Sequence, residues 1–190
     1  MFFRFQSRSQ SSKSRPTTKS RRRFLAPLFE QLEDRRVMAT MPQLLTELGF
    51  SSGSIGNLTP VGTDLYFTAS TQTAGVELWK YDSLTSQTTQ VADINPGSAS
   101  SYPAYLTDVN GTLFFRANDG TNGVELWKHD GTTTSLVQDI RAGSSGSFPV
   151  RLTNVNGTLF FTADDSVSGR ELWKSDGTTA TLVQDIRPGI

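Results

Sequence analysis

From residue 51 onward, apolar residues come in short runs separated by turn residues, and no 3.6-residue helical period occurs after residue 40. Runs of this kind predict β-strands. The clearest set has four runs, at 105–109, 112–117, 124–128 and 135–140. Asn110-Gly111 separates the first two runs and Asp130-Gly131 the last two, and both dipeptides predict tight turns. We therefore expect this segment to form one unit of four short strands.

The predicted strands carry apolar residues on both faces. Successive strand residues point to opposite sides of a sheet, so Leu126 and Trp127 face in opposite directions, as do Phe114 and Phe115. A sheet with one face in water would alternate apolar and polar residues instead. Both faces are therefore expected to be covered, as they are when sheets stack face to face.

The pattern occurs three times. The tetrapeptide Glu-Leu-Trp-Lys begins at residues 77, 125 and 171, and residues 98–143 and 144–189 share 30 of 46 aligned positions. Such a fixed spacing indicates a repeat architecture. The repeat signature consists of Glu77, Leu78, Trp79, Lys80, Glu125, Leu126, Trp127, Lys128, Glu171, Leu172, Trp173 and Lys174. The recurring turn residues are Asn110, Gly111, Asn156, Gly157, Asp130, Gly131, Asp176 and Gly177.

A four-stranded repeat of this length with two apolar faces is what a β-propeller blade requires. The expected fold is therefore all-β, with three blade-like units forming an incomplete ring. A stacked-sheet sandwich and an irregular β-solenoid are the alternatives. The expected order is a basic leader at 1–39, a linker with a lone strand at 40–50, and repeats at 51–97, 98–143 and 144–190.

The third repeat contains Glu-Leu-Trp-Lys-Ser-Asp-Gly-Thr at 171–178, which resembles the ELWxxDGT repeat. The second repeat fits the same pattern, with His129 at a variable position. The first repeat has Asp82-Ser83 where Asp-Gly is expected, so its turn is expected to differ. The resemblance implies a bacterial surface or secreted protein of the kind sometimes labelled hyalin-like.

The leader has a composition of its own. Residues 1–40 hold 10 Lys/Arg and 3 acids, a charge of +7, whereas residues 41–190 hold 8 and 15, a charge of −7. Its first 23 residues are rich in Ser and Arg without hydrophobic periodicity, which predicts disorder. Residues 29–39 resemble the LEPR-XLL segment that begins many bacterial surface proteins, although Asp34 replaces Pro and Val37-Met38 replace two leucines. The resemblance implies export to the cell surface or exterior. A basic arm that binds nucleic acid is the alternative.

Three repeats are few for a propeller, because propellers close with about four to eight blades. Two apolar end faces are therefore expected to be uncovered, and such faces drive association. The segment Leu44–Leu48 resembles a fourth strand and adds a surplus strand before the first repeat. We expect a homodimer that closes one propeller. The alternative is a truncated, non-functional fragment of a longer repeat protein.

The residue types that support catalysis are scarce. The chain has no cysteine and one histidine, His129, at a position where the other repeats have Tyr81 and Ser175. His129 is therefore expected to be a tolerated surface residue, and no triad or thiolate metal site is predicted. No apolar run is long enough to span a membrane. The chain is expected not to be an enzyme.

The repeated carboxylates have two interpretations. Glutamates 77, 125 and 171, with Asp93, Asp139 and Asp185, recur once per repeat, and a ring of them around an axis could hold Ca²⁺. The preferred interpretation places each Glu beside Lys on an exposed strand position and each Asp in a turn.

Two aromatic residues are candidate ligand contacts. Tyr102 and Phe148 each lie between Ser and Pro in a connection between repeats, whereas the tryptophans lie within strands and are expected in the core. The sequence predicts an exported or cell-surface protein with a structural or adhesive role. The alternative is a lectin-like propeller that binds surface polysaccharide through one weak site per repeat.

Overall fold

The computed structural model describes residues 55–71, 73–186 and 188. The predicted leader, the predicted strand at Leu44–Leu48 and the first residues of the first repeat lie outside the described residues. The described part of the chain is all-β and contains no helix, as the sequence predicts.

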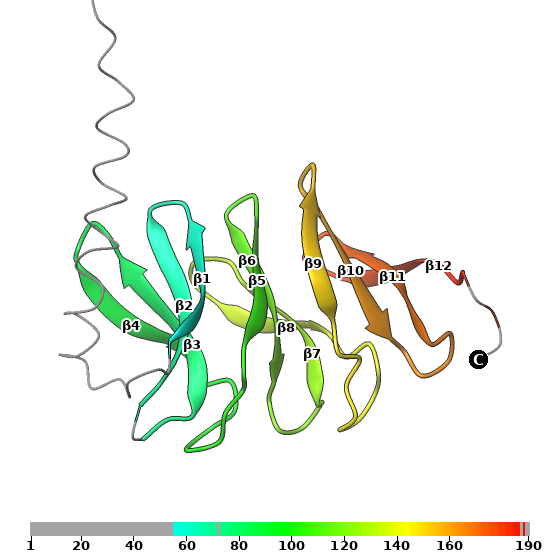
Figure 1. Ribbon diagram of the computed structural model, residues 1–190, viewed down its shortest axis with the longest axis horizontal. Helices are drawn as coiled ribbons and strands as arrows, with labels where there is room; N and C mark the ends of the chain where they lie inside the picture. The colour runs from blue at the N-terminus through cyan, green and yellow to red at the C-terminus, as the bar shows by residue number, and fades with distance from the viewer. Residues whose placement is uncertain (1–54, 72, 187, 189–190) are drawn as a thin grey trace, which may run out of the picture. The chain divides into compact units, whose positions relative to one another are not determined.

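The described strands form three four-stranded antiparallel sheets (Figure 1). Sheet 1 contains β1 (Gly56–Val61), β2 (Asp64–Ser70), β3 (Val76–Asp82) and β4 (Gln87–Ala92). Sheet 2 contains β5 (Ala104–Val109), β6 (Thr112–Asn118), β7 (Val124–His129) and β8 (Thr134–Gln138). Sheet 3 contains β9 (Val150–Val155), β10 (Thr158–Asp164), β11 (Arg170–Ser175) and β12 (Ala180–Gln184). Strands that follow one another in the chain are neighbours in each sheet, which is the meander of a propeller blade.

The first hairpin of each sheet turns as the sequence predicts. Asn110 and Gly111 have φ values of 53° and 84°, and Asn156 and Gly157 have values of 51° and 83°. These are the two positive angles that a type I′ turn requires. In sheet 1 the turn is Gly62-Thr63, and Gly62 alone has a positive φ, of 59°.

The second tight turn also follows the prediction, including the departure in the first repeat. Asp130 accepts hydrogen bonds from the N–H groups of Thr132 (3.0 Å) and Thr133 (2.8 Å), and Gly131 has a φ of 97°. In sheet 1 the corresponding Asp82 also caps its turn, but the positive φ moves to Ser86, at 57°. The missing glycine therefore changes where the chain turns.

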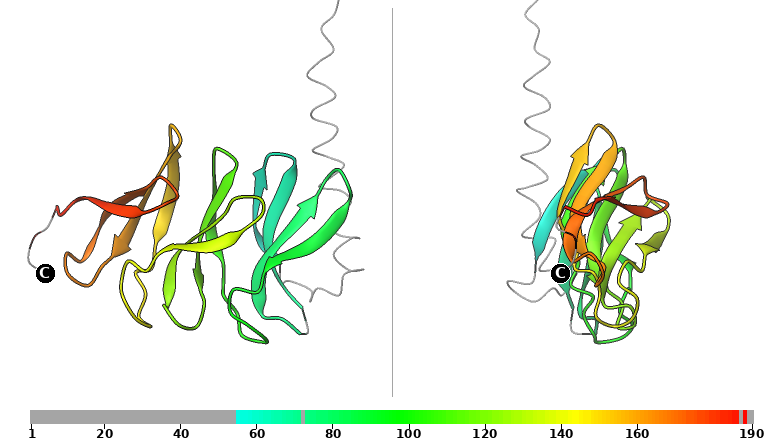
Figure 2. Two further views of the ribbon diagram at one scale, coloured as in Figure 1. Left: turned by 180° about the vertical axis from the view of Figure 1, so that it is seen from behind. Right: turned by 90° about the vertical axis from the view of Figure 1, so that its right-hand side faces the viewer.

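Neighbouring sheets pack face to face (Figures 1 and 2). We call the face of each sheet that points toward the following repeat its forward face, and the opposite face its back face. Between sheets 1 and 2, the forward-face residues Val61, Tyr66, Leu78 and Ile94 pack against Leu113, Phe115 and Ala117. Between sheets 2 and 3, Val109, Phe114, Leu126 and Ile140 pack against Leu159, Phe161, Ala163 and Trp173. The prediction that both faces of a sheet are covered is confirmed for sheet 2.

The two end faces differ from each other. On the back face of sheet 1, Leu65, Phe67, Ala69 and Tyr81 are buried and form a third cluster with Ile55 and Trp79. The prediction of two uncovered end faces is therefore wrong for this face. On the forward face of sheet 3, Val155 is 46% exposed, Val183 43% and Ile186 68%. An apolar face at one end of the described sheets is thus open to solvent.

Candidate functional site

The glutamate of each Glu-Leu-Trp-Lys segment is buried. Glu77 and Glu125 have no exposed surface, and Glu171 is 6% exposed. The preferred sequence interpretation, an exposed Glu beside Lys, is therefore wrong. Each carboxylate lies near the start of the third strand of its sheet, and in sheets 1 and 2 the connection to the next repeat crosses over it.

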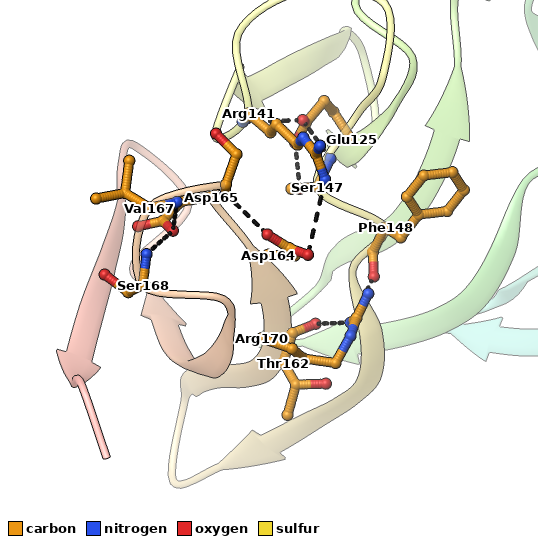
Figure 3. A network of polar contacts seen from close by, with 11 residues as sticks. Glu125, Arg141, Ser147, Phe148, Thr162, Asp164, Asp165, Val167, Ser168 and Arg170 are labelled. Carbon is orange, nitrogen blue, oxygen red and sulfur yellow. Dashed lines mark hydrogen bonds and ion pairs between the residues drawn. The ribbon is translucent and has the colours of Figure 1, made fainter. Parts of the chain in front are cut away.

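Glu125 binds the connection between sheets 2 and 3 (Figure 3). Its Oε1 accepts the backbone N–H of Ser147 at 2.7 Å and that of Arg141 at 3.2 Å. Its Oε2 accepts the hydroxyl of Ser147 at 2.5 Å, a length typical of a hydroxyl bonded to a carboxylate. The side chain thus anchors both ends of the loop that joins the two sheets.

Glu77 makes closely similar contacts one repeat earlier. Its oxygens accept the N–H of Ser101 (2.7 Å), the hydroxyl of Ser101 (2.5 Å) and the N–H of Ile94 (3.3 Å). Burial raises the pKa of both Glu77 and Glu125, and the hydrogen bonds from Ser101 and Ser147 partly offset that effect. Buried carboxylates whose oxygens all accept hydrogen bonds from the protein are expected to stabilise the fold rather than to bind a ligand.

Backbone hydrogen bonds fix the connection between sheets 2 and 3 to both of those sheets. The N–H of Phe148 donates to Val124 O at 3.0 Å, and the carbonyl of Ser147 accepts the N–H of Asp164 at 3.0 Å. Gly123, with a φ of 70°, permits this approach, since a Cβ there would lie 2.6 Å from the nitrogen of Gly146. The connection is therefore held to sheet 2 on one side and to sheet 3 on the other.

Tyr102 and Phe148 occupy equivalent places in the two connections. They are 67% and 45% exposed, and both have a φ of 49°, which is an uncommon backbone conformation for aromatic residues. The backbone hydrogen bonds of the connection hold them there: the N–H of Tyr102 donates to Val76 O at 3.2 Å. Figure 3 shows the ring of Phe148 pointing away from the polar contacts. The two candidate ligand contacts are thus displayed on the surface in a strained conformation.

Side chains of sheet 3 complete the polar contacts around Phe148 (Figure 3). Arg170 donates through Nη1 to the carbonyl oxygens of Phe148 (3.0 Å) and Thr162 (3.4 Å). Arg141 pairs with Asp164 across the junction, at 3.7 Å between Nη1 and Oδ2. These contacts fix the backbone beside Phe148 and leave its ring accessible.

The remaining signature residues pack between sheets or lie at their surfaces. Leu78 and Leu126 are fully buried on forward faces, and Trp127 and Trp173 contact the clusters on back faces. Trp79 packs against the cluster on the back face of sheet 1. Lys80 pairs with Asp64 at 3.0 Å. Leu172 is half-buried and Lys174 is exposed on sheet 3.

His129 is 5% exposed, so its expected place at the surface is wrong. Its ring centroid lies 5.6 Å from that of Tyr66, across the junction of sheets 1 and 2, and its Nδ1 lies 3.0 Å from the hydroxyl of Thr134. Burial lowers the pKa of His129. The equivalent residues of the other repeats did not indicate that His129 is buried. Ser175 is smaller, and Tyr81 belongs to the cluster on the back face of sheet 1.

Within the described ranges, no group of three or more His, Asp or Glu side chains is arranged to hold a metal ion. The glutamates of the hypothetical Ca²⁺ ring are separated from one another, since Glu77 and Glu125 each bind their own connection. The part of the chain that the structure describes also contains no helix able to cross a membrane.

No protein-family model matches this chain, and no curated protein sequence matches it.

Proposed function

We propose that this chain is a structural repeat protein of the cell surface or exterior, in which stacked sheets form a scaffold. The observation that carries the proposal is the use of the repeated residues. Glu77 and Glu125 anchor the connections between sheets, and Leu78 and Leu126 fill the interfaces. Residues repeated for a shared chemistry would instead converge on an accessible site.

Export is the part of the proposal that the sequence supports. The segment 171–178 resembles the ELWxxDGT repeat, and residues 29–39 resemble the LEPR-XLL segment of bacterial surface proteins. Membership of that hyalin-like family is proposed on these motifs. Proteolysis of intact cells that make the chain is the direct measurement: surface-exposed chain is degraded, and chain retained inside is protected.

The scaffold has one apolar face that can pair with another chain. The forward face of sheet 3 exposes Val155, Val183 and Ile186, whereas the corresponding residues Val109 and Ile140 of sheet 2 are 6% and 9% exposed. A face with this composition is buried wherever a neighbouring sheet is present, and exposed apolar patches promote association. We infer that a second copy of the chain covers it.

The buried back face of sheet 1 favours one geometry for this dimer. A closed ring of six sheets would require that face as the partner surface, but Phe67 and Ala69 on it are fully buried within the chain. Pairing of two forward faces about a two-fold axis leaves it undisturbed, and isologous pairing is the commonest arrangement of homodimers. The proposed assembly is therefore a two-fold dimer through sheet 3.

Light scattering of the full chain tests the dimer. We expect a discrete dimer for the wild-type chain and a monomer for Val155→Asp, which places a charge on the exposed face. Val167→Asp is the matched control, since Val167 is 77% exposed in a loop of the same sheet. A monomeric wild-type chain would contradict the proposal, and a polydisperse one would favour the truncated-fragment alternative.

The symmetry can be tested separately, because the chain contains no cysteine. Single variants Val155→Cys and Val183→Cys probe the geometry, because a two-fold axis that passes close to a residue brings that residue within disulfide reach of its own counterpart. A ring pairing sheet 3 with sheet 1 would keep these positions apart. An intermolecular disulfide formed by either variant on mild oxidation would therefore support the two-fold geometry and contradict the ring.

A second candidate function, binding of surface polysaccharide, is favoured by Tyr102 and Phe148. Both rings are exposed, and both residues are held at a φ of 49°. Strained conformations that the surrounding structure maintains often mark functional positions. Aromatic rings at equivalent places in the two connections offer stacking surfaces to separate sugar rings of one chain. A glycan array tests this candidate: saturable binding should be lost in Tyr102→Ala/Phe148→Ala, and uniform absence of binding would exclude it.

A further inference from the structure

A cavity lies between sheets 2 and 3, at the end of the strands where β5 turns into β6 and β7 turns into β8. Its volume is about 210 Å³, below the usual range of about 300–1,000 Å³ for sites of drug-sized ligands. Its wall includes Asn110, Phe114, Lys128 and Asp130 of sheet 2 with Asp176 and Gly177 of sheet 3. A site of this size accommodates one small molecule or one unit of a longer chain.

Two carboxylates and one ammonium group face this cavity. The Oδ1 atoms of Asp130 and Asp176 accept hydrogen bonds from their own turns, from Thr132 and Thr133 in the first case and from Thr178 and Thr179 in the second. Among the described residues, their Oδ2 atoms have no hydrogen-bond donor. These two oxygens are therefore available to a ligand.

The third group is Lys128. It has no ion pair within the described part of the chain, where the two ion pairs are Lys80–Asp64 and Arg141–Asp164. The pKa of Asp176 is lowered first by the turn N–H groups and further by the charge of Lys128. Lys128 therefore lies near a carboxylate of the adjacent sheet without being engaged in a close pair.

The equivalent place between sheets 1 and 2 shows why the cavity is open. There Lys80 is paired with Asp64 at 3.0 Å, and the ring of Tyr66 meets that of His129. Between sheets 2 and 3, Thr112 replaces Asp64 and Phe114 replaces Tyr66, while Ser175 replaces His129. A carboxylate, a phenol hydroxyl and an imidazole ring are thus absent from the second junction. What remains is space bounded by polar groups.

The charges select the chemistry of the ligand. Two carboxylates repel an anion, and the Lys128 ammonium offsets part of their attraction for a cation. Carboxylate oxygens accept hydroxyl protons and the ammonium donates to hydroxyl oxygens, so the groups suit a neutral ligand that carries several hydroxyls. The ring of Phe114 supplies an apolar wall beside these polar groups. It lies close to Gly177, where a Cβ atom would be only 3.2 Å from the ring.

We propose that the cavity between sheets 2 and 3 binds one neutral sugar unit, held by Lys128, Asp130 and Asp176. The inference is independent of the scaffold role and names a site different from Tyr102 and Phe148, which lie at the opposite end of the strands. An interaction through one sugar unit is expected to be weak, with a dissociation constant on the order of 1 mM.

Saturation-transfer NMR on the full chain tests this site, with glucose, galactose, mannose and N-acetylglucosamine as probes. At least one probe is expected to bind saturably. Asp176→Asn and Lys128→Met should each weaken that binding at least tenfold. Lys174→Met is the matched control, because Lys174 is the same residue of the signature on sheet 3, outside the cavity. It should leave the binding unchanged.

A closing variant provides a second, fold-preserving test. Thr112→Asp/Phe114→Tyr introduces the residues that the first repeat carries, so it should fold, fill the cavity and abolish sugar binding. Failure of all four sugars to bind would overturn the proposal, as would binding only of glycine or Ca²⁺, added as charged probes. Sugar binding that survives the closing variant but is lost in Tyr102→Ala/Phe148→Ala would overturn this site while supporting the exposed aromatic site.

Discussion

Sheets 2 and 3 have nearly the same sequence but different surroundings. Their repeats share 30 of 46 positions, yet Val109 is 6% exposed whereas its counterpart Val155 is 46% exposed. Ile140 and Ile186 differ in the same way, at 9% and 68%. The sequence of a repeat defines the sheet, but the neighbouring sheet determines which of its apolar residues are buried. Stability is therefore shared between repeats rather than held within each one.

The largest difference between the two sheets is expected for their signature leucines. Leu126 is fully buried between sheets 2 and 3, so Leu126→Ala should lower the free energy of unfolding by about 3 kcal/mol. Leu172 is half-buried on the open forward face, and Leu172→Ala should cost only about 1 kcal/mol in the monomer. Urea unfolding at a concentration where the chain is monomeric measures both. Equal losses would show that burial by a neighbour is not what distinguishes the sheets.

The next effect concerns the connection that joins these sheets. Glu125→Gln places an amide opposite three donors and is expected to cost about 2 kcal/mol, since only one oxygen remains to accept them. Ser147→Ala removes one of the donors and should cost about 1 kcal/mol. In a double-mutant cycle followed by urea unfolding, the two costs should be strongly non-additive. Simple additivity would contradict a direct interaction between the two side chains.

The hairpin turns could be predicted from the sequence, whereas the burial of the glutamates could not. Asn110-Gly111 was predictable as a turn because the required positive φ angles depend on adjacent residues alone. Glu125 was misplaced because its partner Ser147 is 22 residues away, and nothing local marks the pair. The available signal was the serine that precedes the aromatic-proline pair in both connections, which recurs in step with the glutamate.

The inter-sheet cavity was beyond prediction for a related reason. It depends on which residues of the adjoining strand and of the next sheet lie around Lys128: Thr112 is smaller than its counterpart Asp64, and Asp176 and Gly177 come from sheet 3. Repeat alignment reveals the substitution of Thr112 for Asp64 but not that residues of two sheets line one cavity. The apolar residues on both faces of each repeat predicted that a sheet without a neighbour on one side exposes that face, as sheet 3 does among the described residues, whereas the burial of the back face of sheet 1 was not predicted.

A smaller effect is expected from His129, which sheet 3 replaces with Ser175. Burial, first of all, lowers the pKa of His129; nearby Asp130 opposes that shift and Lys80 adds to it. The unfolded chain therefore binds more protons just below the ordinary histidine pKa of about 6.5, and stability falls as the pH falls through this window. Between pH 7.5 and 5.5, the wild type should lose stability that His129→Ser retains, measured by urea unfolding at each pH. The raised pKa values of Glu77 and Glu125 act in the opposite direction, but they are present in both proteins and cancel from the difference.

The smallest effect tests whether the junction of sheets 2 and 3 can be given the ion pair of the junction before it. Thr112→Asp should place a carboxylate beside Lys128, as Asp64 lies beside Lys80, and stabilise the chain by about 0.5 kcal/mol. Thr158→Asp is the control on sheet 3, where its partner would be the exposed Lys174, so that solvent and salt should screen the pair and leave stability unchanged. Adding 0.5 M NaCl should reduce the gain in Thr112→Asp only in part, because the original pair is half-buried. If both variants gain the same free energy of unfolding, the neighbouring sheet contributes nothing to the ion pair. The contrast between sheets 2 and 3 then applies to apolar contacts alone.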